Sequence, residues 1–337
     1  MRRAVNAFLS SSGAAALALA LLAAAASGED GDLANGSPRA GADRWVPSLA
    51  ATSGLTIQEW KGRVTTLCAG CATPDPALRL PGRSAASGVD LAVTPFVGGE
   101  FELMTPELGI PTSPRLFVGG GVLGAFGFER RVAREGNPGT LASPIPANSQ
   151  STTPYSENFA LGQGSETTAQ VDTFVYGARA GVAFPLELFD RSFRLKPSVG
   201  WVHYKVDAKG QVSDAECETV PTPSGTNCNS QVPPGSLRAI QLSGSASERF
   251  DGIGGGLDLE MDTLRIGPLG SSLFIGAHAF RILGNREIAF GASASFPDSG
   301  APGLGAATVS SFHRVELDAV MVRVGLGLRV HWLGAGD

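Results

Sequence analysis

The sequence predicts an all-β fold, an antiparallel up-and-down barrel of eight strands. Three observations predict it. Gly (45) and Pro (22) are plentiful among the 337 residues, which favours many short turns. No helical apolar period is sustained. The segments Gly252–Asp262 and Val322–Trp332 alternate between an apolar face and a face of glycines and charges, as β-strands do. At this length an all-β barrel forms one domain.

The first residues are typical of a targeting signal. Arg2 and Arg3 precede the apolar run Ala14–Ala26, which ends in small residues suited to cleavage. A retained membrane anchor is the alternative, but a spanning helix needs roughly 20 apolar residues. We therefore expect a signal peptide over 1–26, a flexible linker over 27–54, the barrel over 55–333 and a short tail over 334–337.

Charge argues against nucleic acid as a partner. The chain has 26 basic and 31 acidic residues, and removal of Arg2 and Arg3 leaves 24 basic residues. No basic stripe or basic–aromatic alternation is present, so nucleic acid is an improbable partner. No segment after the targeting signal has the long uncharged apolar window of a transmembrane helix. A membrane location would therefore require strands.

The expected strands are joined by two kinds of connection. We predict strands at 55–67, 89–104, 114–131, 168–184, 192–212, 236–263, 271–296 and 307–333. Short connections rich in Pro and Gly (105–113, 185–191, 264–270) alternate with longer ones rich in Ser, Thr, Pro and Gly (68–88, 132–167, 213–235, 297–306). Outer-membrane barrels have short periplasmic turns and long external loops, with both termini on the short-turn side.

The polar face decides which side of each strand points inward. Alternation alone fits a soluble barrel equally well, since there the apolar face is the interior. Here the polar face mixes glycine with both signs of charge, and glycine makes room where side chains crowd inside a narrow barrel. Buried charges persist when they are paired. We therefore predict a lumen charge network of Asp258, Glu260, Asp262, Arg179, Arg323 and Arg329.

The aromatic residues predict two belts. Tyr176 and Phe184 lie eight positions apart on one strand, as do Phe193 and Trp201 on the next. At about 3.3 Å per residue and a tilt near 40°, eight residues climb roughly 20 Å, close to the ~25 Å apolar band between aromatic girdles. With Trp332, these residues form the predicted aromatic girdle.

One strand changes its pattern along its length. The apolar positions Val315 and Leu317 are out of step with the apolar face that starts at Val322, which predicts a β-bulge near Val320–Met321. This strand and 236–263 are also longer than the ~9–11 residues that cross a membrane. We expect the surplus to extend the barrel above the outer surface.

No motif for chemistry stands out. Cys68, Cys71, Cys217 and Cys228 fall in the expected external loops, where local disulfides are favoured over a redox motif or a zinc site. The four histidines (His203, His278, His313, His331) lie on separate expected strands without motif partners, and the two Gly triplets open no helix. We expect no metal, no cofactor and no enzymatic activity.

In its signal peptide, sided loops and terminal strand with Trp332, the chain resembles the small bacterial outer-membrane β-barrels of the outer-membrane protein A type and the porin-like eight-stranded barrels. The resemblance implies a bacterial outer-membrane location, with membrane lipid and the barrel assembly machinery as partners. One departure is that Leu333–Asp337 follow Trp332, whereas such barrels end at an aromatic residue. The leading hypothesis is a non-enzymatic envelope protein that displays loops 132–167 and 213–235 to an unspecified extracellular partner. The alternatives are a narrow passive channel and a barrel enzyme acting on lipid or peptide.

Overall fold

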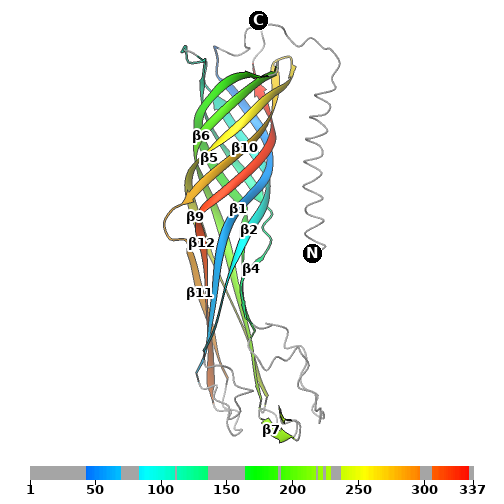
Figure 1. The fold of residues 1–337 in the computed structure, drawn as a ribbon, viewed down its shortest axis with the longest axis vertical. Helices are drawn as coiled ribbons and strands as arrows, with labels where there is room; N and C mark the ends of the chain where they lie inside the picture. The colour runs from blue at the N-terminus through cyan, green and yellow to red at the C-terminus, as the bar shows by residue number, and fades with distance from the viewer. Residues whose placement is uncertain are drawn as a thin grey trace.

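A computed structural model gives the fold, a closed eight-stranded antiparallel β-barrel (Figure 1). The structure describes residues 43–69, 83–110, 112–135, 164–188, 191–217, 219–222, 225–228, 237–296 and 306–333. Within these ranges no helix has the length and apolar character needed to cross a membrane. The expected signal peptide 1–26 and tail 334–337 lie outside the described residues.

The barrel strands follow one another in chain order. They are β1 (Val46–Ala69), β2 (Arg83–Met104), β3 (Arg115–Ala125), β5 (Gly164–Leu188), β6 (Arg191–Cys217), β9 (Leu237–Ile266), β10 (Leu269–Ile282) and β12 (Ala307–Trp332), and β12 closes the ring on β1. β4 (Arg130–Glu135) continues the line of β3, and β11 (Glu287–Phe296) that of β10. β7 (Thr219–Thr222) and β8 (Gly225–Cys228) form a separate hairpin. The predicted eight-stranded barrel is confirmed, although two expected strands, 114–131 and 271–296, are each interrupted.

The first strand starts earlier than expected. β1 begins at Val46, so the prediction of a linker over 27–54 is wrong for its last part. Ser48 and Thr52 are buried on the inward side while Leu49 is exposed on the outward side. Small polar residues fit inside because large side chains from other strands fill the lumen, and these small residues conceal the strand pattern.

In the described part of the chain, the short connections lie at one end of the barrel, as predicted. Short connections join β2 to β3, β5 to β6, and β9 to β10, where Gly267 adopts the positive φ of a tight turn. The first residues of β1 pair with the last of β12, for example Ser48 with His331, at the same end of the barrel (top of Figure 1). The turn expected at Pro185–Arg191 is shorter, because β5 continues to Leu188.

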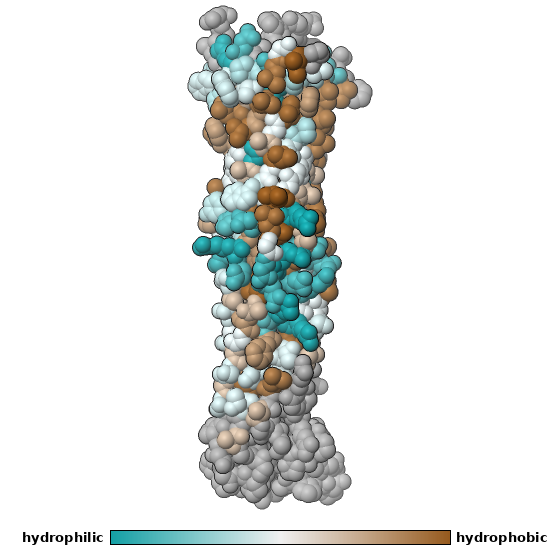
Figure 2. Space-filling view, turned by 90° about the vertical axis from the view of Figure 1, so that its left-hand side faces the viewer, coloured by the Kyte–Doolittle hydropathy of each residue, from teal (hydrophilic) through white to brown (hydrophobic). Residues whose placement is uncertain are grey.

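The barrel has two parts of opposite chemistry. The short-turn half comprises 46–55 of β1, 191–201 of β6, 322–332 of β12 and the parts of the other strands beside them. Here Leu326 and Leu328 are exposed and Arg329 is buried. In the loop half, which comprises the rest of these strands, Leu317 is buried and Arg314 is exposed. Figure 2 shows apolar residues toward the short-turn end and a hydrophilic belt farther down the barrel.

This change of chemistry corrects the predicted role of the bulge. β12 does carry an irregularity: Gln58 pairs with Met321 and Trp60 with Leu317, so residues 318–320 face one residue of β1. Leu317 and Met321 are nevertheless both buried, and alternate residues point inward on either side. The expected flip of phase is therefore wrong. The inward face stays the same, and only its surroundings and composition change.

In the loop half the ring divides into two four-stranded sheets. One has the order β2-β1-β12-β11 and the other β4-β5-β6-β9; among the described residues no ladder joins β2 to β4 or β9 to β11. Their inward side chains form one apolar core. His313 spans the two sheets, with Nδ1 2.8 Å from the hydroxyl of Thr167. Burial lowers the pKa of His313 to about 4.

Candidate functional site

Ionisable side chains fill the lumen of the short-turn half. They form the lumen cluster, defined as Glu100, Glu102, Asp258, Glu260, Asp262, Arg179, Arg194, Lys196, Arg323 and Arg329. Alternation along β2, β5, β6, β9 and β12 places these residues on the inward face. The five carboxylates and five cations balance one another.

The centre of the cluster is a network from four strands. Lys196 donates to Glu102 and, at 3.2 Å, to Glu260. Arg329 donates through Nη1 to Glu260 at 2.5 Å and to Glu102 at 3.4 Å. All four side chains are essentially inaccessible to solvent. Each charge therefore has opposite charges beside it, which is the condition under which buried ions persist.

Arg179 adds β5, the strand opposite β12 in the ring, to the network. It donates to Asp258, and its Nη2 donates to Glu100 at 3.0 Å and to Glu102 at 3.2 Å. Its guanidinium carbon also lies 5.8 Å from the centroid of the Phe117 ring, within reach of a cation–π interaction.

The mouth at the short-turn end offers a group that could hold a metal ion. Ligand atoms of Glu260, Asp262 and His331 lie within 4.8 Å of one another. However, Arg194 pairs with both carboxylates, at 2.9 Å from Glu260, and its Nη2 lies 3.2 Å from His331 Nε2. Ser272 donates to Glu260 at 2.6 Å as well. The positive charge that a metal would supply is thus already provided by a side chain.

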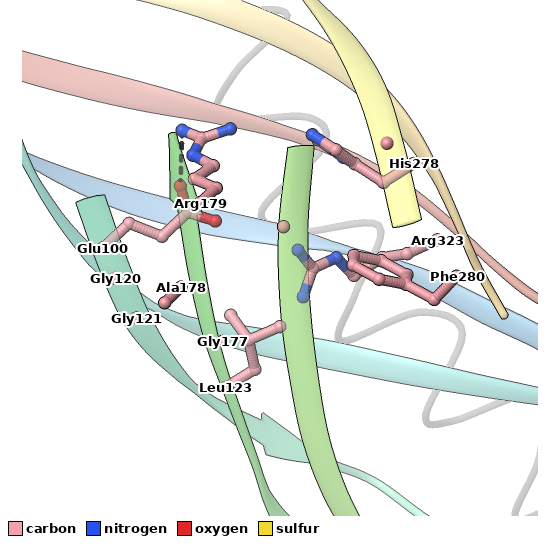
Figure 3. A pocket seen from close by; sticks show the side chains of 12 residues that line it. Glu100, Gly120, Gly121, Leu123, Gly177, Ala178, Arg179, His278, Phe280 and Arg323 are labelled. Atoms are coloured by element: carbon pink, nitrogen blue, oxygen red, sulfur yellow. Dashed lines mark hydrogen bonds and ion pairs between the residues drawn. The ribbon is translucent and has the colours of Figure 1, made fainter. Parts of the chain in front are cut away.

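Arg323 lies deeper, between aromatic rings. Its guanidinium carbon is 5.3 Å from the ring centroid of Phe280 and 6.0 Å from that of Phe96. Figure 3 shows Arg323 beside Phe280 in a small cavity that Arg179, Glu100 and His278 also line. The cavity measures about 20 Å³, which is enough for a single water molecule.

The lumen remains closed farther along, in the loop half. The Trp60 indole and the Tyr204 hydroxyl both donate to Oε1 of Gln58, at 3.2 Å and 3.0 Å, and all three side chains are buried. The cavity between this group, Met321 and Phe96 measures about 10 Å³. Two fillings of different chemistry, one ionic and one apolar, therefore lie in series along the axis.

The two halves of the ring repeat the same parts. On β2 and β9, glycines precede the acidic pairs Glu100/Glu102 and Asp258/Glu260. The next strands contain the related segments Leu116–Gly119 (LFVG) and Leu273–Gly276 (LFIG). The strands after those carry Gly-x-Arg at Arg179 and Arg329. Matching strands are four places apart in the ring, but the charged residues are shifted in register: Glu102 pairs with Gly119, whereas Glu260 pairs with Phe274.

The repeat extends to contacts and irregularities. Phe117 lies over Arg179, and Phe274 lies over Arg329 at 4.8 Å from its guanidinium carbon. The third strand of each half is interrupted, between β3 and β4 and between β10 and β11. The fourth strand of each half, β5 or β12, has a register irregularity near the same level.

The structure places the six residues of the predicted charge network on the inward face. Arg179, Asp258, Glu260 and Arg329 are brought together by ion pairs. Asp262 lies at the mouth with its side chain 47% exposed, and Arg323 contacts rings. Sequence reasoning missed the following members: Glu100, Glu102, Arg194 and Lys196. The repeated acidic pair after glycines was the signal that could have found two of them.

The predicted girdle residues face outward to different extents. Tyr176 and Trp201, toward the loop half, are exposed, as is Trp332 at the short-turn end. Phe184 and Phe193 are half-buried where β5 turns into β6. Trp201 donates through its indole to Asp251 at 3.0 Å, so it presents a polar edge just above the apolar band.

The predicted disulfides lie outside the described part of the chain. Cys71 falls in an undescribed segment, and of the side chains of Cys68, Cys217 and Cys228 nothing is described. The pairing of the cysteines therefore stays a prediction.

The fold defines the chain as an eight-stranded antiparallel β-barrel. No family model and no curated protein matches its sequence. Among solved structures, the outer membrane protease OmpT from Escherichia coli is similar with a TM-score of 0.23 at 7% identity, covering 83% of this chain and 96% of that one. A FadL homologue from Pseudomonas aeruginosa is similar with a TM-score of 0.17 at 10% identity, covering 86% and 90%. At these TM-scores the likeness carries no argument about activity.

Proposed function

We propose that this chain is an integral outer-membrane protein whose barrel is closed to solutes and whose loop half and long connections form an envelope interaction surface. The observation that carries the proposal is the filled lumen. An ionic cluster and an apolar core occupy it in series, and the cavities that adjoin them, about 20 and 10 Å³, hold no more than isolated water molecules.

The outward face of the short-turn half supports the membrane location. Its apolar run covers Phe193–Trp201 on β6 and Ile253–Met261 on β9. Each run matches the ~9–11 tilted residues that cross a membrane. The loop half, polar outside and apolar inside, has the composition of a barrel in water. This orientation puts the long connections outside the cell and the short turns in the periplasm.

Conductance in planar bilayers tests the proposal. The purified full chain should insert without steady current steps. A control with Trp60→Ala, Tyr204→Ala, Glu260→Ser and Arg329→Ser removes bulk from both fillings while preserving net charge, and it should conduct. Steady steps from the unmodified chain would overturn the closed-barrel proposal in favour of a narrow channel.

An enzymatic role is the second candidate, and one observation bears on it. His203 Nδ1 lies 2.9 Å from Asp251 on the outer surface, where a histidine–carboxylate pair could serve as a base. The same carboxylate accepts the Trp201 indole hydrogen bond, and the His203 and Trp201 rings stack at 5.8 Å. The His203–Asp251 pair is therefore explained by its role in holding Trp201, a residue of the aromatic girdle, without any catalytic role. Peptide or lipid hydrolysis lost in His203→Gln would favour the enzyme.

A further inference from the structure

The loop half consists of two sheets, and no long connection of the chain joins one sheet to the other. The first sheet, β2-β1-β12-β11, carries the connections β1–β2 and β11–β12, and the second sheet, β4-β5-β6-β9, carries β4–β5 and β6–β9. The chain passes between the sheets through β3 and through β10, which both belong to the closed ring. The two sheets can therefore move apart without stretching a long connection.

The backbone is irregular at the level where the sheets leave the ring. The third strand of each half breaks there, over 126–129 and 283–286, and Gly284 in the second break has a φ of 70°. β5 shifts its register between Val171 and Val175, and β12 does so beside Met321. Hinges are a few residues at the ends of elements that absorb changes of backbone angle. These positions give the sheets a hinge on the ring, about which the continuous strands β1, β2, β6 and β9 would bend.

His313 of the first sheet contacts the second sheet from the inside. It is 2% exposed, and its Nδ1 lies 2.8 Å from the Thr167 hydroxyl on β5. The ring stacks on Phe290 of its own sheet, with the ring centroids 5.0 Å apart. A Cβ at Gly210 of β6 would collide with the imidazole, so the second sheet closes over His313 because a glycine lies there.

The surroundings of His313 suit a neutral imidazole. Val64 pairs with it on β1 and Phe290 on β11. The charged residues next to the surrounding positions point outward: Arg63 on β1, Arg134 on β4, Glu166 on β5, Lys209 on β6 and Arg314 on β12. Burial lowers the pKa of His313 to about 4. A proton on His313 would therefore place an unpaired charge among apolar side chains, which is costly.

The inner faces beyond His313 contain unsatisfied polar atoms. His313 Nε2, Thr66 Oγ1 and Ser165 Oγ are buried without a hydrogen-bond partner among the described residues. Thr66 lies two positions nearer the long connections than Val64, and Ser165 two positions nearer than Thr167. A buried polar group without a partner costs about 1–3 kcal/mol, and water would reach all three atoms if the sheets separated. The contact between the sheets is therefore weakest at this end of the barrel.

We propose that the two sheets separate at their loop ends when His313 takes up a proton, while the ring of the short-turn half stays closed. Opening moves the two connections of one sheet away from the two of the other. It would rearrange the interaction surface of the proposed function, but the opening itself does not rest on that function. With a pKa of about 4 in the closed form and an ordinary 6.5 in water, the ratio of closed to open molecules should fall about 100-fold between pH 7.5 and pH 4.

Distances between spin labels test the opening in the purified full chain. p-Acetylphenylalanine carrying a nitroxide replaces Phe312 of the first sheet and Lys209 of the second, which are both exposed. A second pair of labels replaces Leu326 and Val199 in the ring, which are exposed as well. Between pH 7.5 and pH 4 the distance of the first pair should lengthen, and that of the ring pair should stay constant. An unchanged first pair, or equal changes in both pairs, would overturn the proposal.

Substitution of the histidine assigns the opening to this residue. His313→Gln keeps an amide that can reach Thr167 but takes up no proton, so its labels should remain at the closed distance at pH 4. Unheated gel mobility shows whether the variant is a folded barrel, and His313→Leu replaces it if it does not fold. Opening at pH 4 in the folded variant would show that another group is responsible and would overturn the proposal.

The unsatisfied hydroxyls provide an independent arm. Thr66→Val combined with Ser165→Ala removes both, which stabilises the closed form and should move the opening to lower pH. Thr65→Val, on the outer face of the same strand, is the control and should leave the midpoint in place. No shift in the double variant, or an equal shift in the control, would overturn the role of these hydroxyls in the opening.

Discussion

Glu260 is the carboxylate on which the lumen cluster depends most. It lies 2.9 Å from Arg194, 3.2 Å from Lys196 and 2.5 Å from Arg329, and its side chain is fully buried. Glu260→Gln keeps the shape but leaves five buried cations against four carboxylates. Breaking a buried ion pair on one side costs about 3–5 kcal/mol. We expect the free energy of unfolding to fall by that amount in urea titrations of the chain in lipid vesicles.

A double-mutant cycle separates charge imbalance from lost packing. Arg329→Met alone should cost about 3–5 kcal/mol for the same reason. Glu260→Gln combined with Arg329→Met restores the balance, so its cost should fall below the sum of the single costs by about 1–3 kcal/mol. Asp262→Asn at the exposed mouth is the control and should cost less than about 1 kcal/mol. Additive single effects, or a loss below about 1 kcal/mol in Glu260→Gln, would refute the reasoning.

Three further predictions concern single residues. The pKa of His313 is about 4 in the fold against an ordinary 6.5, so the unfolded chain binds the proton more readily. The free energy of unfolding of the loop half should therefore drop by about 3 kcal/mol as the pH falls from 6.5 to 4. Amide hydrogen exchange in the loop half should accelerate accordingly, and His313→Gln should remove this pH dependence. Leu317→Ala should lower the free energy of unfolding by about 2–5 kcal/mol and accelerate amide hydrogen exchange in the loop half. Phe312→Ser, on the exposed face, should do neither. Arg323→Met should cost less than Arg329→Met in urea titrations, because Arg323 contacts rings rather than carboxylates; equal losses would contradict this.

Much of the barrel could be predicted because strand patterning is local. Alternation in Gly252–Asp262 and Val322–Trp332, together with turn residues, was enough to find all eight strands and the inward charges of β9 and β12. The start of β1 was missed because inward Ser48 and Thr52 show no contrast with a linker. Lys196 was missed because a single charge in a strand does not reveal its partners, and Glu102 lies far away in sequence.

The change of pattern in β12 was misinterpreted for a physical reason. A period of two identifies two faces, but the identity of the inner face depends on what surrounds the barrel. In lipid the outer face must be apolar, and the inner face is free to hold paired charges. In water the outer face must be polar, and an apolar inner face supplies the folding energy. A strand that passes from lipid to water, as we propose for β12, would therefore exchange the chemistry of its faces without a change of phase. Leu317 is buried in one half and Leu326 is exposed in the other.

The irregularities lie where this exchange occurs, and the two kinds of filling explain why. The closed ring of the short-turn half is bridged across its lumen by long charged side chains. The loop half is instead two sheets packed face to face, an arrangement that keeps sheets about 10 Å apart. A ring that becomes two sheets must open at two opposite places. The interruptions between β3 and β4 and between β10 and β11 lie on strands four places apart, where the two seams begin. A closed lumen thus follows from both parts of the fold, so a passage would require the ionic and the apolar fillings to be disrupted together.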